Sequence, residues 1–365
     1  MTTLVLLASL GMAQATSPGP RTPLQNSATQ ARMAGKLDDA ILKYKQALQG
    51  TPNWSEGWYF LGTIYYEKER PRECAESFAR FVKLQPNVSA GFALMGLCLY
   101  QVKDYANSLV ALTRAERIGL PQGEQLTDVA SYHAAMLYTR DGNFEKALQI
   151  LNFFSRRESI DPKLIELTGI AALRRPIFPA DLPSDDRELI YRTGRAVMTA
   201  GARRAAEASS QFEELLRDFP AANNLHFVYG SLLLGSDQDA ALKQFDAELK
   251  LQPDHLPSLV IKGLTYLGQG KFDDARKSGE AAVKAGPGNF TAYTVLGRAL
   301  AEGDIDVAGG INALEKAVLL EPGSPQVRIA LAAAYAKAGR REDAAKQRAE
   351  FLRLKKLAEG GGGAP

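Results

Sequence analysis

The 365-residue chain has few of the residues from which reactive and metal-binding sites are built, with only two cysteines and three histidines. No two of His133, His226 and His255 have the four-residue spacing that places two metal ligands on one face of a helix, and no Cys-x-x-Cys motif is present. The sequence therefore predicts no metal site, and nothing in it indicates a cofactor.

Motifs for catalysis are also missing. A Gly-x-Ser-x-Gly sequence, which would present a nucleophilic serine on a sharp turn, does not occur. Gly270 and Lys271 resemble part of a phosphate-binding loop, but six residues separate Gly263 from Gly270 where that loop has four, and Phe272 replaces its Ser or Thr. The sequence thus predicts no catalytic residues and favours a protein that is not an enzyme.

Neither sign of charge dominates the chain. It carries 44 basic and 41 acidic side chains, for a formal net charge of +3. A protein that binds nucleic acid usually concentrates its basic residues in a stripe or patch. The balanced composition therefore predicts no nucleic-acid partner.

The longest apolar run at the N-terminus covers only residues 4–10, which is too short for a permanent membrane span. Ala13 and Ala15 follow it with the small-x-small spacing of a signal-peptidase site. We therefore expect residues 1–15 to be a signal peptide and the protein to be exported, to the periplasm of a bacterium. No Lys or Arg precedes the run, so the alternative is a cytoplasmic protein whose N-terminus is not a signal.

What the chain does contain is a repeat of about 34 residues. After Gly62 a tyrosine follows at three residues, a small residue at twelve and a proline at twenty-four, and the same pattern follows Gly263. The two copies are Gly62, Tyr65, Cys74 and Pro86, and Gly263, Tyr266, Ala275 and Pro287. A period of this length is typical of stacked helical repeats that each contact only their neighbours.

Each period divides into two helical segments joined by a short turn. In the copy that contains Gly62, the first segment places Trp58, Leu61 and Tyr65 on one helical face. The second segment carries a small residue followed four positions later by a bulky one, as in Cys74 and Phe78. Small residues at these positions would allow the two helix backbones to approach closely.

These residues and spacings resemble the tetratricopeptide repeat family, over roughly residues 21–355. The resemblance implies an all-α fold, a right-handed superhelical solenoid of about nine antiparallel helix pairs. The spacing fails near 163–188, where Pro176, Pro179 and Pro183 interrupt the pattern. We therefore expect an N-terminal arm at 21–162, a degenerate half-repeat and loop at 163–188, a C-terminal arm at 189–358, and a flexible tail at 359–365.

The two cysteines lie at positions of buried type in adjoining repeats. A disulfide between Cys74 and Cys98 requires their Cα atoms to come within about 7 Å, which the sequence does not establish. Two buried free thiols that behave as small apolar residues are the favoured expectation.

The resemblance also implies where a partner would bind, because in this family the first helix of each repeat lines the concave surface. Transferred by position, the groove residues are Tyr59, Thr63, Tyr66, Leu97, Tyr100, Tyr132, Met136 and Arg140. Aromatic side chains are common in interfaces, since a tyrosine combines an apolar ring with a hydroxyl group. The alternative is that several of these tyrosines pack between neighbouring helices.

The leading hypothesis for function is a non-enzymatic scaffold that binds proteins or peptides on its concave face. A self-associating assembly factor is a second hypothesis. An enzyme with its site in the loop at 176–188, which carries Asp181, Asp185 and Asp186, is a third. For Asp186 the simpler expectation is that its carboxylate caps the following helix.

Overall fold

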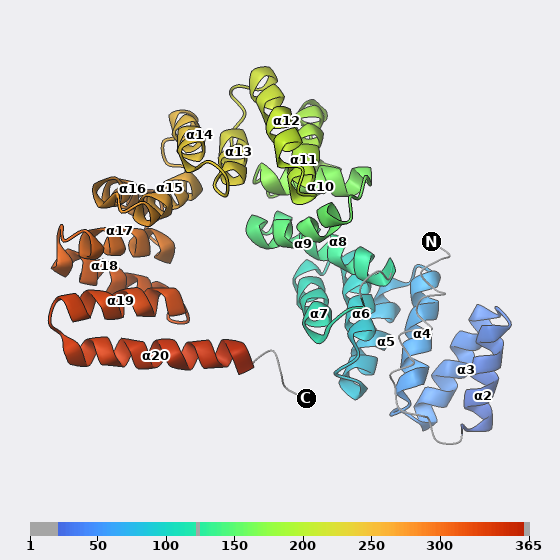
Figure 1. The fold of residues 1–365 in the computed structure, drawn as a ribbon. Helices are drawn as coiled ribbons and strands as arrows, with labels where there is room; N and C mark the ends of the chain where they lie inside the picture. The colour runs from blue at the N-terminus through green and yellow to red at the C-terminus, as the bar shows by residue number, and fades with distance from the viewer. Residues whose placement is uncertain (1–20, 122–124, 361–365) are drawn as a thin grey trace. The chain divides into compact units, whose positions relative to one another are not determined.

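The computed structural model describes residues 21–121 and 125–360 (Figure 1), and no strand occurs within these ranges. The chain divides into two compact units, Met1–Ala208 and Ser209–Pro365. This division lies inside α12 (Ala205–Asp218), whereas the segment 163–188, where the sequence suggested a break, belongs to the first unit. The all-α solenoid of helix pairs predicted from the repeat is confirmed.

In the first unit the elements are α2 (Pro23–Met33), α3 (Leu37–Gly50), α4 (Ser55–Glu67), α5 (Pro71–Leu84), α6 (Ser89–Gln101), α7 (Tyr105–Ile118), α8 (Gln125–Arg140), α9 (Phe144–Arg156), α10 (Pro162–Ala172), the 3₁₀ turns η2 (Pro179–Asp181) and η3 (Ser184–Asp186), and α11 (Arg187–Gly201). In the second unit they are α13 (Leu225–Leu233), α14 (Gln238–Leu251), α15 (Leu256–Gly268), α16 (Phe272–Ala285), α17 (Phe290–Glu302), α18 (Val307–Leu320), α19 (Pro325–Lys337) and α20 (Arg341–Gly360).

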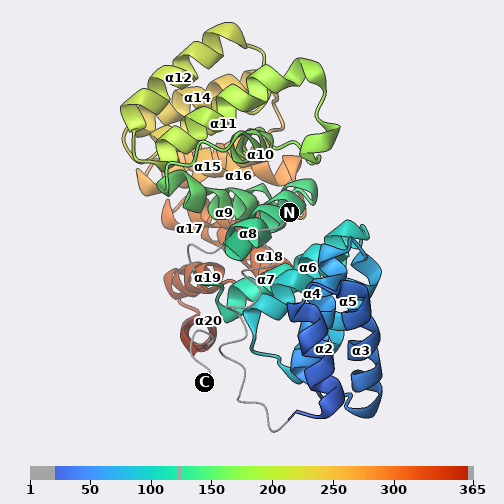
Figure 2. The same ribbon diagram turned by 90° about the vertical axis from the view of Figure 1, so that its right-hand side faces the viewer.

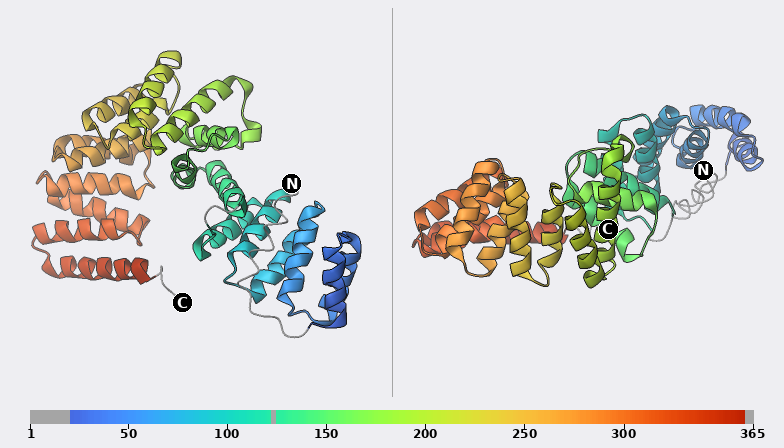
Figure 3. Two further views of the ribbon diagram at one scale, coloured as in Figure 1. Left: turned by 45° about the vertical axis from the view of Figure 1, so that its right-hand side comes forward. Right: turned by 90° about the horizontal axis from the view of Figure 1, so that it is seen from above.

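Helices that are consecutive in the sequence pack against each other within each unit. Figure 2 shows α2–α7 of the first unit lying side by side, and Figure 3 shows the same arrangement for the orange to red helices α15–α20 of the second. The strongest packing joins the two helices of a repeat, such as α4 with α5 or α17 with α18. Each pair also packs on the next one, which buries a continuous apolar layer.

Glycines in the first helix of a pair allow this close packing. A Cβ atom built on Gly62 would lie 2.8 Å from the ring of Phe78, and one built on Gly96 would lie 2.7 Å from Leu112. The backbone of the first helix therefore contacts a bulky side chain of the second. A hydrogen bond also joins the two helices at this point. The buried hydroxyl of Ser108 donates to the carbonyl oxygen of Gly96 on the neighbouring helix.

The turn inside a repeat has one recurring geometry. The backbone amide of Arg70 donates to the carbonyl of Tyr65 at 2.9 Å, and Lys271 donates to Tyr266 in the same way. The residue before the donor has a positive φ, 54° at Glu69 and 69° at Gly270. This is the Schellman arrangement, which satisfies carbonyl groups at the end of a helix and reverses the chain.

The single α-helix of the irregular segment, α10, pairs with α11, the helix that follows this segment. α10 packs on α11, and the two backbones meet at two glycines. A Cβ atom on Gly169 would lie 1.9 Å from the carbonyl oxygen of Ile190, and one on Gly194 would lie 1.9 Å from that of Ile165. The loop that joins α10 and α11 therefore connects two helices whose backbones are in near contact.

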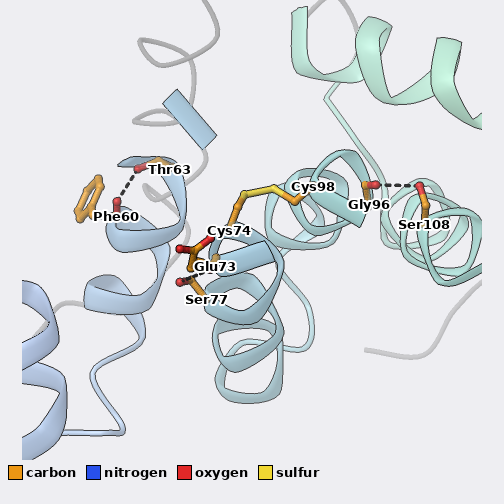
Figure 4. The surroundings of a disulfide bond; sticks show 8 residues. All are labelled: Phe60, Thr63, Glu73, Cys74, Ser77, Gly96, Cys98 and Ser108. Atoms are coloured by element: carbon orange, nitrogen blue, oxygen red, sulfur yellow. Dashed lines mark hydrogen bonds between the residues drawn. A yellow bond between two sulfur atoms is a disulfide. The ribbon is translucent and has the colours of Figure 1, made fainter. Parts of the chain in front are cut away.

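The structure corrects the expectation of free thiols, because Cys74 and Cys98 form a disulfide (Figure 4). Cys74 lies on α5 and Cys98 on α6, so the bond links the second helix of one repeat to the first helix of the next. Their Cα atoms are 5.9 Å apart, within the range that a disulfide requires. The sequence indicated burial for both residues, but only the packing of α5 on α6 brings them together.

A buried carboxylate supports the start of a helix in the second unit. Glu248 on α14 is fully buried and accepts hydrogen bonds from the backbone amides of Asn224, at 2.8 Å, and Phe227, at 3.2 Å. These amides lie at the N-terminus of α13, where the first N–H groups lack partners within the helix. Glu248 is therefore explained as a structural cap contributed by a neighbouring helix.

Reduction of the disulfide should lower the stability of the first unit. The bond spans 24 residues of sequence, and a crosslink of this span contributes about 3 kcal/mol to the free energy of unfolding. Urea denaturation with and without dithiothreitol measures the difference. A variant with both Cys74→Ala and Cys98→Ala serves as control and should not respond to the reductant. Equal midpoints for the wild type under both conditions would contradict the prediction.

Replacing each of two nearby glycines by alanine should change the stability of the chain in opposite directions. Gly270 has a φ of 69° with open space around it, so Gly270→Ala should destabilise the chain by about 1 kcal/mol through backbone strain alone. Gly268 is also surrounded by open space but ends α15 with helical backbone, so Gly268→Ala should stabilise it by about 0.5 kcal/mol. Thermal melts of both variants beside the wild type provide the measurement. Shifts of the same sign would be inconsistent with the turn described above.

Candidate functional site

Four of the eight residues predicted to line a groove are core residues. Tyr59, Thr63, Leu97 and Met136 are at most 7% exposed. The ring of Tyr59 packs 5.0 Å from that of Phe81, between centroids. This corrects the expectation that these four line an open surface. The reason is that α4 and α6 pack on helices of their own repeat and on those of neighbouring repeats, which leaves only a narrow exposed face.

The other four residues are partly exposed. Tyr66 lies near the end of α4 and packs against the apolar core of the first unit. Tyr100 on α6, with Tyr132 and Arg140 on α8, lies in a separate place where several aromatic rings meet. The alternative that the tyrosines pack between helices therefore holds for Tyr59, while three of the predicted residues share one surface.

The aromatic surface has an imidazole at its centre. The ring of His133 lies 4.8 Å from that of Tyr100 and 5.6 Å from that of Tyr132, both in edge-to-face arrangements. Tyr105, at the start of α7, lies 5.5 Å from Tyr100. The hydroxyl of Tyr100 also reaches the sulfur of Met136 at 3.7 Å.

Phe178 completes this group, although it comes from the irregular loop after α10. Its ring lies 5.1 Å from that of Tyr105 and 6.3 Å from that of Tyr100. The guanidinium of Arg140 lies over two rings, 4.7 Å from the centre of Tyr105 and 5.5 Å from that of Phe178. We call these residues the aromatic cluster: Tyr100, Tyr105, Tyr132, His133, Arg140 and Phe178.

Sequence reasoning missed Tyr105, His133 and Phe178. Tyr105 is the first residue of a second helix, a position that the family resemblance does not assign to a groove. Phe178 lies outside the repeat pattern, so no spacing rule applies to it. Its position between Pro176 and Pro179 was the available signal, because an aromatic residue in a proline-rich loop has to find an apolar partner elsewhere.

A pocket of about 490 Å³ opens beside the aromatic cluster. It lies between α8 and the turn that leads from α9 into α10, and Tyr132 and His133 belong to both the pocket and the cluster. The complete lining is Asp128, Val129, Tyr132, His133, Phe154, Arg157, Ser159, Asp161, Lys163 and Leu164. A volume of this size accommodates one or a few side chains of a bound peptide.

The charged residues that line the pocket are balanced, and the side chains of Asp128, Arg157 and Asp161 are engaged with neighbouring groups. Arg157 donates to Asp128 at 2.7 Å, and its guanidinium lies 5.3 Å from the centre of the Phe153 ring. Asp161 caps α10 by accepting from the backbone amide of Lys163 at 2.9 Å. The pocket therefore presents no strong excess of either charge.

The two titratable ring residues of the pocket, Tyr132 and His133, are uncharged at neutral pH. Burial raises the pKa of Tyr132 to about 12, so its hydroxyl stays protonated and can donate a hydrogen bond. Burial also lowers the pKa of His133 below its usual 6.5, against the effect of its hydrogen bond to the carbonyl of Val129. Because a carbonyl can only accept, Nδ1 carries the proton and Nε2 is left as an acceptor.

The acidic loop pairs its carboxylates with neighbouring groups. Asp186 lies 3.7 Å from Arg175, and Asp185 accepts from the hydroxyl of Ser184 at 3.1 Å. Asp186 precedes α11 but its side chain makes no capping hydrogen bond, which corrects the expectation that it caps this helix. The loop is held by ion pairs at its base.

The described part of the chain lacks both a metal-binding cluster and a membrane-spanning helix. Within residues 21–121 and 125–360, no group of three or more His, Cys, Asp or Glu side chains is arranged to hold a metal ion. None of the helices in these ranges combines the length and apolar character needed to cross a membrane. The signal peptide expected at residues 1–15 lies outside the described residues.

Comparison with known families identifies the repeat. Family models described as tetratricopeptide repeat match residues 55–88, 200–255 and 262–308. The first match coincides with α4 and α5, and the other two cover α12–α14 and α15–α17. A search of curated proteins gives no match.

The chain is also similar to solved structures of MamA and of an APC/C complex. Residues 41 to the end of MamA from Desulfovibrio magneticus RS-1 are 26% identical and have a TM-score of 0.42, over 48% of this chain and 97% of that one. A double mutant titled MamA RS-1 ArsTM is 25% identical with a TM-score of 0.43, over 49% and 98%. The APC/C hetero-tetramer Cut9–Hcn1 is 13% identical with a TM-score of 0.41, over 97% and 90%.

The segments that the family models match coincide with stacked helices of the structure. The repeat fold is typically a non-enzymatic module for protein–protein interaction, and these repeats support a scaffold function for this chain. Tetratricopeptide repeats are thus identified in the chain at residues 55–88, 200–255 and 262–308.

Proposed function

We propose that the first unit binds an extended segment of another protein over the aromatic cluster, and that the pocket beside α8 accepts one of its side chains. The single observation that carries this proposal is the position of Tyr132, whose ring contacts His133 in the cluster and lines the pocket. A ligand that covers the cluster would therefore also reach the pocket.

The lining of the pocket supports an apolar side chain with polar neighbours as its occupant. Val129, Phe154 and Leu164 provide apolar surface. Tyr132 offers a hydroxyl donor and His133 an acceptor, which suit the backbone groups of a peptide. Because Asp128 and Arg157 neutralise each other, discrimination would come from shape and hydrogen bonds rather than from charge.

We also propose that the protein is exported. The apolar run at 4–10 with Ala13 and Ala15 supports it, and a disulfide between Cys74 and Cys98 is a feature of proteins in oxidising compartments. Expression of the chain with and without residues 1–15, followed by cell fractionation, tests it. Recovery of the full chain from the cytoplasm, at its unprocessed mass, would contradict export.

Tyr132→Ala should weaken peptide binding by about 2 kcal/mol, or roughly 30-fold in Kd, because the ring contributes to both parts of the site. Peptides selected from a random phage-displayed library on the wild-type chain provide the ligands, and fluorescence anisotropy measures their affinity. Tyr293→Ala is the matched control, since Tyr293 is a half-buried tyrosine of α17 in the second unit. Equal losses in the two variants would argue against this site.

Binding to the same selected peptides should weaken below about pH 6.5. The pKa of His133 is lowered by burial, so the ring is neutral above its usual value of 6.5 and gains a proton only at lower pH. Protonation would convert Nε2 from an acceptor to a donor and break a hydrogen bond to it. His133→Gln should remove this dependence. An affinity that is constant from pH 7.5 down to the lowest pH at which the circular dichroism is unchanged would contradict the assignment.

A further inference from the structure

The contacts of Phe178 differ from those of the rest of its loop. Its ring lies against Tyr105 and Tyr100, under the guanidinium of Arg140, and yet the side chain is only partly buried. A phenylalanine side chain that comes from an irregular segment thus fills part of the surface proposed above to bind a partner. This position is the one that an aromatic side chain of a ligand would take.

Phe178 packs against two apolar clusters of the first unit, and contacts of other residues also hold its loop in place. Leu182 is buried, with 5% of its surface exposed, and anchors the second half of the loop. Ion pairs hold the base, Arg175 with Asp186 at 3.7 Å and Arg187 with Glu166 at 2.9 Å. The contact of Phe178 with the aromatic cluster can therefore be lost while the loop and the crossing of α10 and α11 remain.

The backbone around Phe178 has the form of a short recognition segment. Phe178 is extended, with φ −79° and ψ 153°, and Pro179–Asp181 then make one 3₁₀ turn. The amide of Asp181 donates to the carbonyl of Phe178 at 2.9 Å. Asp181 lies near enough to Tyr100 for its charge to contribute to the raised pKa of that tyrosine, after burial and the effect of Tyr105.

We propose that the aromatic cluster is a recognition site for a phenylalanine followed by proline, and that Phe178 occupies it in cis until a partner segment of this chemistry displaces it. This inference rests on the proposed function and names its ligand class. The preference for phenylalanine follows from edge-to-face packing on tyrosine rings and from the guanidinium over the ring.

Because Phe178 already occupies the cluster, a partner segment has to displace it in order to bind. A side chain tethered by a short loop acts at an effective concentration of about a millimolar or more. A competing segment therefore binds the wild-type chain with an apparent affinity reduced by the fraction of sites that Phe178 fills. Removal of the Phe178 ring should expose the cluster and raise the affinity for a peptide of the same chemistry.

The test uses a fluorescein-labelled peptide with the sequence of residues 174–183 as the probe. Its Kd is measured by anisotropy on the full chain carrying Phe178→Ala, on the wild type, and on Phe92→Ala. Phe92 is the matched control because it is also partly buried and also lies under an arginine, Arg114, at 5.9 Å, but outside the cluster. We expect the Phe178→Ala chain to bind the probe at least tenfold more tightly than either of the others.

Specificity for the cluster is tested in the Phe178→Ala chain. Adding Arg140→Ala, or replacing the phenylalanine of the probe by alanine, should weaken binding at least tenfold, with circular dichroism and melting temperature as controls for folding. Equal affinity of the Phe178→Ala and wild-type chains for the probe would overturn the proposal. So would dimerisation of the wild type that Phe178→Ala abolishes, because the occupant would then be a second copy.

The outcome also separates this inference from the proposed function. If library peptides bind through Tyr132 but the 174–183 probe does not bind the Phe178→Ala chain, the site binds partners and only the assigned ligand class is wrong. If the probe binds through Arg140 while Tyr132→Ala changes nothing, the phenylalanine is bound without Tyr132, and the proposed function, which rests on Tyr132, is wrong.

Discussion

The close approach of paired helices is the constraint on which the rest of this structure depends. Gly62 against Phe78, and Gly96 against Leu112, leave no room for a Cβ atom between the helices of a repeat. Because each helix then fits its neighbour at a defined distance, the next pair is positioned in turn, and the buried layer continues through the unit. The glycine contact between α10 and α11 applies the same constraint where the repeat pattern itself fails.

This packing decides which side chains are available for binding. The first helices of the repeats are apolar around most of their circumference, so Tyr59 and Leu97 are required inside. Tyr100 and Tyr132 stay partly exposed because they lie where the regular stacking gives way to the loop after α10. The candidate site thus arises at an irregularity in the array, where a loop residue meets the first helices of two repeats.

The disulfide and the aromatic cluster illustrate two uses of adjacent repeats. Cys74 and Cys98 connect the second helix of one pair covalently to the first helix of the next. Arg140 and Tyr105 make a noncovalent connection of the same kind between α8 and α7, which Phe178 extends to the loop. In both cases, the contacts that matter are made with a residue of the neighbouring helix rather than within one helix.

The amino-acid sequence alone determined the repeat period, the helix pairs and the turns between them, because these depend on local spacing and on residues such as Gly270 that suit a positive φ. It also predicted that Tyr100, Tyr132 and Arg140 line a binding groove, which stays a prediction. Only the tertiary structure decided that Tyr59, Thr63, Leu97 and Met136 are buried, that the cysteines pair, and that Phe178 joins the site. These outcomes depend on contacts between segments far apart in the sequence, whose distances are set by how each helix packs on the next, and a periodic pattern contains no information about them.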